Sequence, residues 1–141
     1  MTKNMLTATA IVTSGFWVNL SEFLRNEILL GSLWKSHFLS LGLTFPSTPM
    51  AGMIWGTWGF IFGAVIFAVS RRHTIIETTI ICWVVGFVLM WLVSWNLLVL
   101  PLAVLPYAIP LSLLETLVAA AICVRIFPQT LDVKDVPTRP S

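Results

Sequence analysis

The chain has 141 residues, of which 57% are hydrophobic and 10% charged, and its formal net charge is +2. A soluble domain of this length has one modest core to fill and does not need so much apolar surface. The apolar runs are continuous and long enough to span a bilayer, whereas a β-barrel would show alternating strands of about ten residues. The composition therefore predicts an all-α membrane protein, and the small net charge gives no reason to expect a nucleic acid partner.

The first predicted span covers residues 5–24 and continues as a more polar helical end over residues 25–34. Lys3 followed by an apolar run is also typical of a secretory signal peptide. Here the small residues Ala8 and Ala10 lie inside the apolar run and not after it. We therefore expect this segment to stay uncleaved as a membrane span.

The outer end of this span carries a polar face. Asn19, Glu22 and Asn26 recur at i, i+3 and i+7 and so lie on one side of a helix. Arg25 is placed to pair with Glu22 along the same helix. Two interpretations follow: these groups form part of a polar pocket, or they form a solvated helix end with its own ion pair.

The second predicted span, residues 49–70, is marked by regularly spaced glycines and stops at Arg71 and Arg72. A glycine stripe weakens a helix in water, but in lipid it lets a second helix approach closely. We predict that this stripe is a helix-packing seam and that the fourth span lies against it. Its members are Gly52, Gly56, Gly59 and Gly63.

The third predicted span covers residues 74–95, with Thr74 as its N-cap and Glu77 as the capping-box partner. Three prolines then interrupt an apolar connector over residues 96–110, which we expect to lie at the interface or to dip back into the protein. The fourth span is predicted over residues 107–127. The remaining residues 129–141 are polar and proline-rich, which predicts a disordered cytoplasmic tail. The predicted fold is an antiparallel bundle of four transmembrane helices within residues 1–128.

Basic residues predict the orientation of the bundle in the membrane. With a cytoplasmic N-terminus, four crossings leave six basic side chains inside and only Arg25 and Lys35 outside. We therefore predict a multi-pass protein of the cell membrane, of the bacterial inner-membrane kind, with both termini cytoplasmic. The six inside residues are Lys3, Arg71, Arg72, Arg125, Lys134 and Arg139.

Glu115 is the most informative single residue, because it lies well inside the fourth predicted span. A carboxylate at that depth costs about 2.5–3.5 kcal/mol to insert and should face the bundle, paired or protonated. It is flanked at helical spacing by small or polar residues, among them Ser112, Ala119 and Cys123. It is either a site for a proton or a cation, or a hydrogen-bonded group that only fixes helix packing.

By this topology, Glu22, Arg25 and Glu115 lie toward the same outer face and are predicted to converge on one pocket. Most tryptophans fall in the outer half of the predicted bundle, which is typical of an interfacial aromatic belt. The alternative is an aromatic-lined cavity suited to a lipophilic cation or a flat apolar ligand. The candidate lining residues added on this basis are Asn19, Trp55, Trp58, Asn96 and Tyr107.

No motif for a nucleotide, a metal or acyl transfer is present, so we predict no cofactor and no metal site. Cys82 and Cys123 lack a paired motif and are predicted to be small apolar core residues. His37 is interpreted as a solvated loop residue. An enzyme acting on a lipid head group through Glu22 and His37 is the weakest function class considered.

Four short spans with an embedded glutamate and many tryptophans resemble the architecture of the small multidrug-resistance exporters. This chain departs from that pattern: it is longer, its first-span glutamate lies near the outer end, and its charge bias opposes dual insertion. The first hypothesis is a small binding or transport protein, assembled as a homo-oligomer. The alternative is a non-catalytic accessory subunit whose glycine seam docks onto a larger membrane complex.

Overall fold

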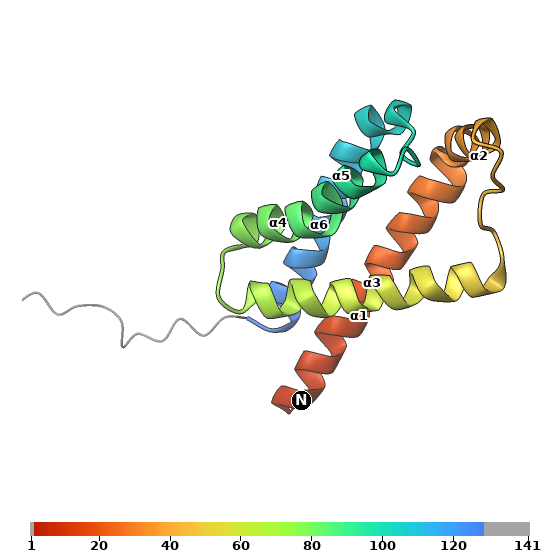
Figure 1. Ribbon diagram of the computed structural model, residues 1–141. Helices are drawn as coiled ribbons and strands as arrows, with labels where there is room; N and C mark the ends of the chain where they lie inside the picture. Colours follow the sequence, from red (N-terminus) through yellow and green to blue (C-terminus); the bar gives the residue numbers. More distant parts are fainter. Residues whose placement is uncertain (1, 129–141) are drawn as a thin grey trace, which may run out of the picture.

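The computed structural model describes residues 2–128, most of which are helical (Figure 1). The predicted tail over residues 129–141 lies outside this described part. Two of the segments are π-helical and continue the α-helices on either side of them. In chain order the elements are α1 (Lys3–Phe23), a π-helical segment (Leu24–Leu29), α2 (Gly31–Ser40), α3 (Pro49–Ser70), α4 (Ile75–Trp83), a second π-helical segment (Val84–Val88), α5 (Leu89–Asn96), a 3₁₀ turn (Leu102–Val104) and α6 (Leu105–Ile126).

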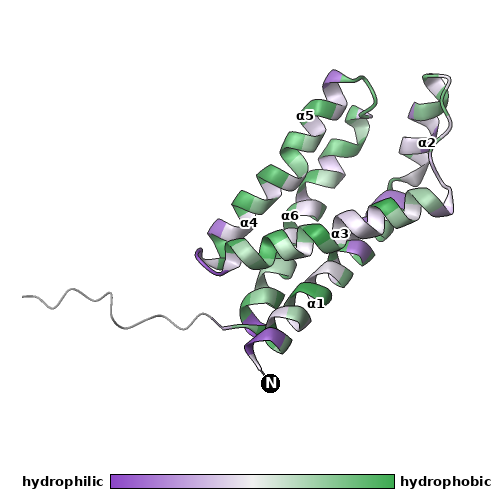
Figure 2. Cartoon of the chain, turned by 60° about the horizontal axis from the view of Figure 1, so that its bottom comes forward, coloured by the Kyte–Doolittle hydropathy of each residue, from purple (hydrophilic) through white to green (hydrophobic). Residues whose placement is uncertain are grey.

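Within residues 2–128, three helices are long and apolar enough to cross a membrane. They are Pro49–Ser70, Ile75–Asn96 and Leu102–Ile126, the second of which joins α4, its π-helical segment and α5. Figure 2 shows hydrophobic residues along much of these helices and hydrophilic ones at the start of α1 and at the turn between α3 and α4. The chain is thus compatible with a small multi-pass membrane protein.

The N-terminal helix α1 is not one of these three helices, so the first predicted span, residues 5–24, stays a prediction. Its buried face carries small and polar residues, while its exposed face carries large apolar ones, including Val12, Phe16, Leu20 and Phe23. This distribution is the reverse of that of a surface helix in a water-soluble protein.

Two helix starts follow directly from the sequence. Thr48 caps α3 by accepting a hydrogen bond from the Ala51 amide, with Pro49 in the first turn. At α4 the predicted capping box is confirmed: the Thr74 hydroxyl accepts from the Glu77 amide, and the Glu77 carboxylate accepts from the Thr74 amide. These caps explain why α3 and α4 start where they do.

The helix α1 packs against both α3 and α6, and α4 also packs against α6. Figure 1 shows α1 and α3 crossing obliquely, so that their contact is confined to a short region around the crossing point. The core beside this crossing combines aromatic rings with small residues on α6. Its fully buried members include Val18, Phe62, Ile66, Phe87 and Ala119.

The glycine stripe of α3 is used differently from the prediction. A Cβ on Gly63 would lie 2.7 Å from the Gly15 nitrogen, and one on Gly59 would lie 2.5 Å from the Asn19 amide oxygen. The seam at these two positions therefore packs against α1, not against the fourth span. A Cβ on Gly52 or Gly56 would meet nothing within 4 Å among the described residues. The reason is geometric, because α3 diverges from α1 beyond the crossing.

The proline-rich connector is shorter than predicted. The helix α6 begins at Leu105, with Pro106 in its first turn and Pro110 inside it. Pro106 is tolerated because the first-turn amides need no helical partner. The chain reverses over residues 97–101, where Leu98 takes a positive φ of 60°. Leu100 and Val104 of the connector pack against Leu30, which covers the connector from the side of α2.

Candidate functional site

Arg25 is the centre of the site, and the end of α1 delivers it into the protein interior. It stands in the π-helical segment that follows α1, three residues after Glu22. Residues three apart share a helix face, so both side chains point inward. Arg25 is only 4% exposed and Glu22 only 7%. Buried charges of this kind need partners, because burying an isolated ion is very costly.

Two carboxylates share the Arg25 guanidinium. Its Nη1 donates to Glu115 Oε2 at 2.7 Å, and its Nη2 donates to Glu22 Oε1 in a short ion pair. We call Glu22, Arg25 and Glu115 the charge cluster. With all three groups ionised, the cluster carries a formal charge of −1 in a buried position. A proton or a bound cation would neutralise it.

The Arg25 guanidinium also lies over an aromatic ring. Its Cζ is 5.1 Å from the centroid of Phe87, a residue of the second π-helical segment. A cation in this position is attracted by the ring face. Arg25 is therefore held from three directions, by two carboxylates and one ring.

Glu22 is linked to the α2 segment by a chain of hydrogen bonds. The Asn26 amide donates to Glu22 Oε2 at 2.7 Å, and Trp34 Nε1 donates to Asn26 Oδ1 at 3.1 Å. Both oxygens of the Glu22 carboxylate therefore accept a hydrogen bond from the protein. A carboxylate has about four acceptor positions, so Glu22 keeps capacity for a further donor.

Glu115 is more completely buried than Glu22. It is 1% exposed, and its Oε1 has no hydrogen-bond partner among the described residues. Its main-chain carbonyl accepts from Trp17 Nε1 at 3.1 Å, which ties α6 to α1. The small residues Ser112 and Thr116 beside it let the neighbouring helices approach.

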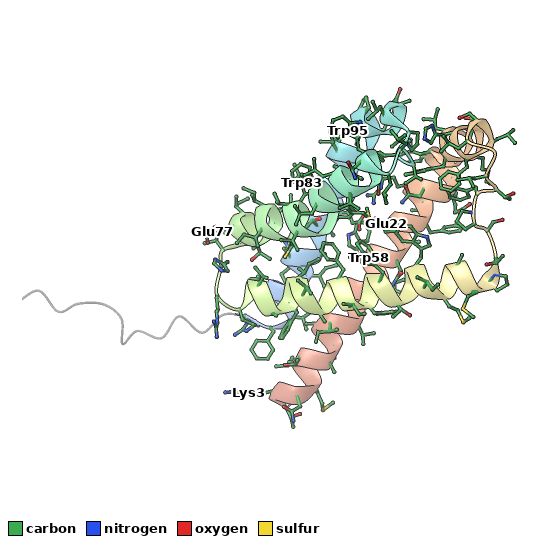
Figure 3. All side chains as sticks on the ribbon, in the orientation of Figure 1. Lys3, Glu22, Trp58, Glu77, Trp83 and Trp95 are labelled. Atoms are coloured by element: carbon green, nitrogen blue, oxygen red, sulfur yellow. The ribbon has the colours of Figure 1, made fainter. Side chains whose placement is uncertain are left out.

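A cavity of about 680 Å³ opens above the charge cluster. Glu22 and Arg25 form part of its lining, whereas Glu115 does not. Figure 3 shows Glu22 inside the molecule, between α1 and the α4–α5 helix. The size falls in the range of pockets that bind small organic ligands. Its aromatic walls come from Trp34, Trp55, Phe87 and Trp91, and residues 45–48 complete it on the side of the α2–α3 loop.

The structure brings Glu22, Arg25 and Glu115 together, as the polar spacing and the common outer half had suggested. Asn19 and Trp55 also line the cavity. Asn19 is held by the crossing, since its amide donates to the carbonyls of Gly15 and Gly56 at 2.9 and 3.2 Å. Gly52 and Gly56 border the cavity as well, which gives these two glycines a place in its wall instead of in a helix seam.

Three candidate residues are placed differently from the prediction. Trp58 lies behind the cavity wall, stacked on Phe62 and edge-on to Phe87. Asn96 and Tyr107 are exposed and do not line the cavity. For Asn96 the cause is helical phase: α5 turns Trp91 and Ser94 toward the cavity, so a residue two positions beyond Ser94 points away from it.

Sequence reasoning missed Phe87 and the contribution of the α2–α3 loop. Phe87 stands in a uniformly apolar run in which no periodicity distinguishes one face from another. Phe45 lines the cavity from the loop, and its ring lies 5.4 Å from Phe38 and 6.4 Å from Trp34. The one sequence feature that could have indicated the contribution of this loop is the group of aromatic residues on both sides of Gly42.

Comparison with known proteins adds nothing to this geometry. No protein-family model matches the chain. Neither a curated protein nor a solved structure matches it. The function is therefore argued from the charge cluster and the cavity alone.

Proposed function

We propose that this chain is a small integral membrane protein that binds a lipophilic cation in the cavity above the charge cluster. The observation that carries the proposal is the pairing of a buried cluster of two carboxyl groups and one guanidinium, of formal charge −1 when all three are ionised, with an aromatic-lined cavity of about 680 Å³. Aromatic faces attract cations, and apolar walls favour a ligand that has shed its water. Transport of that ligand across the bilayer is the corresponding activity.

The arrangement of Arg25 favours a cation over an anion as the ligand. Its guanidinium already donates to Glu22 and to Glu115, so its charge is offset by two carboxylates. At the cavity rim, Glu27 is likewise paired with Lys35 at 3.8 Å. With both carboxyl groups of the cluster ionised, an anion would meet excess negative charge, whereas a cation would neutralise it.

Membrane insertion is part of the same proposal. We infer that α1 also spans the membrane, in addition to the three helices above, because its exposed face is apolar and its polar face contacts α3 and α6. Both termini would then lie on the cytoplasmic side, and the cavity would open toward the outer side. A homo-oligomer is the expected assembly, since four helices alone barely enclose a pathway.

The test is binding of tetraphenylphosphonium, a hydrophobic monovalent cation, to the purified protein in lipid nanodiscs by calorimetry. We expect Glu22→Gln to weaken binding about tenfold or more, because a charge-assisted interaction is worth about 1.5–3 kcal/mol. Glu77→Gln is the matched control, since it removes the same charge from an exposed residue at the far end of α4 and keeps a capping-box side chain. Equal binding by wild type and Glu22→Gln would remove the proposal.

The accessory-subunit alternative rests on one observation, the open space beside Gly52 and Gly56. Because both glycines border the cavity, a partner would have to enter the cavity to approach α3 there. That alternative predicts that Gly56→Leu abolishes co-purification with a partner while Glu115→Gln leaves it intact. A crosslinking experiment in native membranes that yields only the monomer counts against it.

A further inference from the structure

A second hollow lies on the outside of the molecule, next to the cavity. It is a groove of about 530 Å³ between α3 and the α4–α5 helix. Its lining is almost wholly apolar and includes Ile61, Val65, Leu89 and Val93. Both helices are among the three able to cross a membrane, so in a bilayer this groove would face the lipid chains.

In the second π-helical segment, a glycine lies beside the groove at the contact with α3. Gly86 lines the groove, and a Cβ on it would lie 2.5 Å from the Phe62 ring. A larger residue there would push α3 and the α4–α5 helix apart or displace the Phe62 ring. The close approach of the Phe62 ring beside the groove therefore depends on the missing side chain of Gly86.

The groove and the cavity share part of their lining. Met90 and Ser94 line both of them. Between the two hollows stands a wall of three rings: Trp58 stacks on Phe62 at 5.0 Å, and Phe87 is edge-on to Trp58 and Phe62 at 5.9 and 5.6 Å. Figure 3 shows Trp58 on α3 pointing toward this interior region. Methionine is flexible and serine is small, so a slender chain would pass these two side chains more readily than the three rings.

From this shared lining we propose that the ligand is a single-chain amphiphile with a cationic head, such as an alkylammonium ion. Its head binds in the cavity above Glu22 and Arg25, and its alkyl chain leaves past Met90 and Ser94 into the groove. Charge complementarity selects the head, because the charge cluster carries a formal charge of −1 when its three groups are ionised. The apolar lining of the groove selects the alkyl chain of the ligand. This alkyl chain can enter the groove without leaving the hydrocarbon of the bilayer. This inference rests on the proposed cation binding and specifies its ligand class.

The direct test locates the alkyl chain. A dodecyltrimethylammonium probe with a photoreactive diazirine at the end of its chain is bound to the protein in phosphatidylcholine nanodiscs, illuminated, and mapped by mass spectrometry. We expect crosslinks concentrated on Ile61, Leu89 and Val93. Crosslinking at these positions should fall about tenfold in Glu22→Gln, which loses the anchor for the head.

Two substitutions on α5 sharpen the test. Val93→Trp fills the groove, and Leu92→Trp adds the same ring one residue away, outside the groove lining. Both positions tolerate a large side chain, since Val93 is 60% exposed and Leu92 53%. Crosslinking should be lost in the first variant and kept in the second.

Uniform labelling of all lipid-facing residues, or groove labelling that Glu22→Gln does not change, would overturn the inference, because the probe would then be following bulk lipid. The tetraphenylphosphonium measurement separates this failure from a failure of the proposed function. That ion has no alkyl chain, so its dependence on Glu22 would persist if only the groove assignment were wrong.

Discussion

Arg25 and Phe87 lie in contact although 62 positions separate them in the chain, and the Arg25 Cζ is 5.1 Å from the centre of the Phe87 ring. Each residue belongs to a π-helical segment, one after α1 and the other between α4 and α5. Such segments widen a helix by one residue and often occur at functional sites. Here the two segments meet at Arg25 and Phe87 beside the cavity, and Arg25 is the only buried Lys or Arg side chain within residues 2–128.

The charge cluster predicts an asymmetry between its members. Arg25→Met leaves two buried carboxylates without their shared cation, which should cost about 3–5 kcal/mol of stability. Glu115→Gln keeps an oxygen that can accept from Arg25 and leaves one carboxylate with one guanidinium, a neutral pair. Thermal unfolding in detergent should therefore show a large loss for the first variant and little change for the second. Similar losses for both would contradict a cluster with excess negative charge.

The charge cluster could be predicted from the sequence because charged residues are rare in the apolar spans. Only three charged side chains occur between residues 75 and 127, so a carboxylate at position 115 was conspicuous. Helical spacing then placed Glu22 and Arg25 on one face, and the spans placed them in the same half of the bundle as Glu115. Burying an unpaired charge costs free energy, so buried charged groups pair with one another. This pairing can be predicted without knowing how the helices cross.

The walls of the cavity could not be predicted from the sequence, because they depend on the crossing of α1 and α3. All four glycines of the α3 stripe look alike in sequence, yet Gly59 and Gly63 pack against α1 while Gly52 and Gly56 face open space. Spacing shows which side of a helix is small but not where its neighbour diverges. For the same reason Trp55 lines the cavity and Trp58 does not.

This division of the glycine stripe gives a matched pair of substitutions. Gly63→Ala would bring a Cβ within 2.8 Å of the Gly15 Cα, a backbone atom that can only move with its helix. We expect a loss of about 1–3 kcal/mol, as for other overpacked contacts. Gly52→Ala has room and should leave stability unchanged or slightly raised. Thermal stability in detergent distinguishes them, and equal effects would mean that α1 and α3 do not cross at Gly63.

The Trp34 side chain has two roles that one substitution separates. Trp34→Phe keeps an aromatic ring in the cavity wall but removes the donor to Asn26. Asn26 in turn orients Glu22, so we expect weaker tetraphenylphosphonium binding, by about threefold to tenfold, for one lost hydrogen bond of about 1 kcal/mol. Phe38→Leu, which alters the same wall without touching a polar contact, is the comparison. A larger loss in Phe38→Leu would show that ring stacking, not Glu22 orientation, governs affinity.

A proton on the charge cluster makes binding proton-linked. If the cluster is neutralised by a proton in the empty state, an arriving cation replaces it, and one proton leaves for each cation bound. Release is measured with a pH indicator in weakly buffered solution as tetraphenylphosphonium is added. Glu115→Gln should abolish the release, because its Oε1 is the carboxylate oxygen left without a donor in the described part of the chain. Undiminished release from that variant would assign the proton elsewhere.

The orientation of the chain can be tested with its own cysteines as an internal control. Cys82 and Cys123 are each 1% exposed, so a membrane-impermeant maleimide should not label the wild type in intact cells. Ser47→Cys places a thiol on the exposed α2–α3 loop, and Lys3→Cys places one at the exposed start of α1. With α1 as a fourth span and the N-terminus inside, the first variant is labelled in intact cells and the second only after permeabilisation. If α1 does not cross the membrane, both sites lie on the same side and are labelled together. The topology predicted from the excess of basic residues would then be wrong.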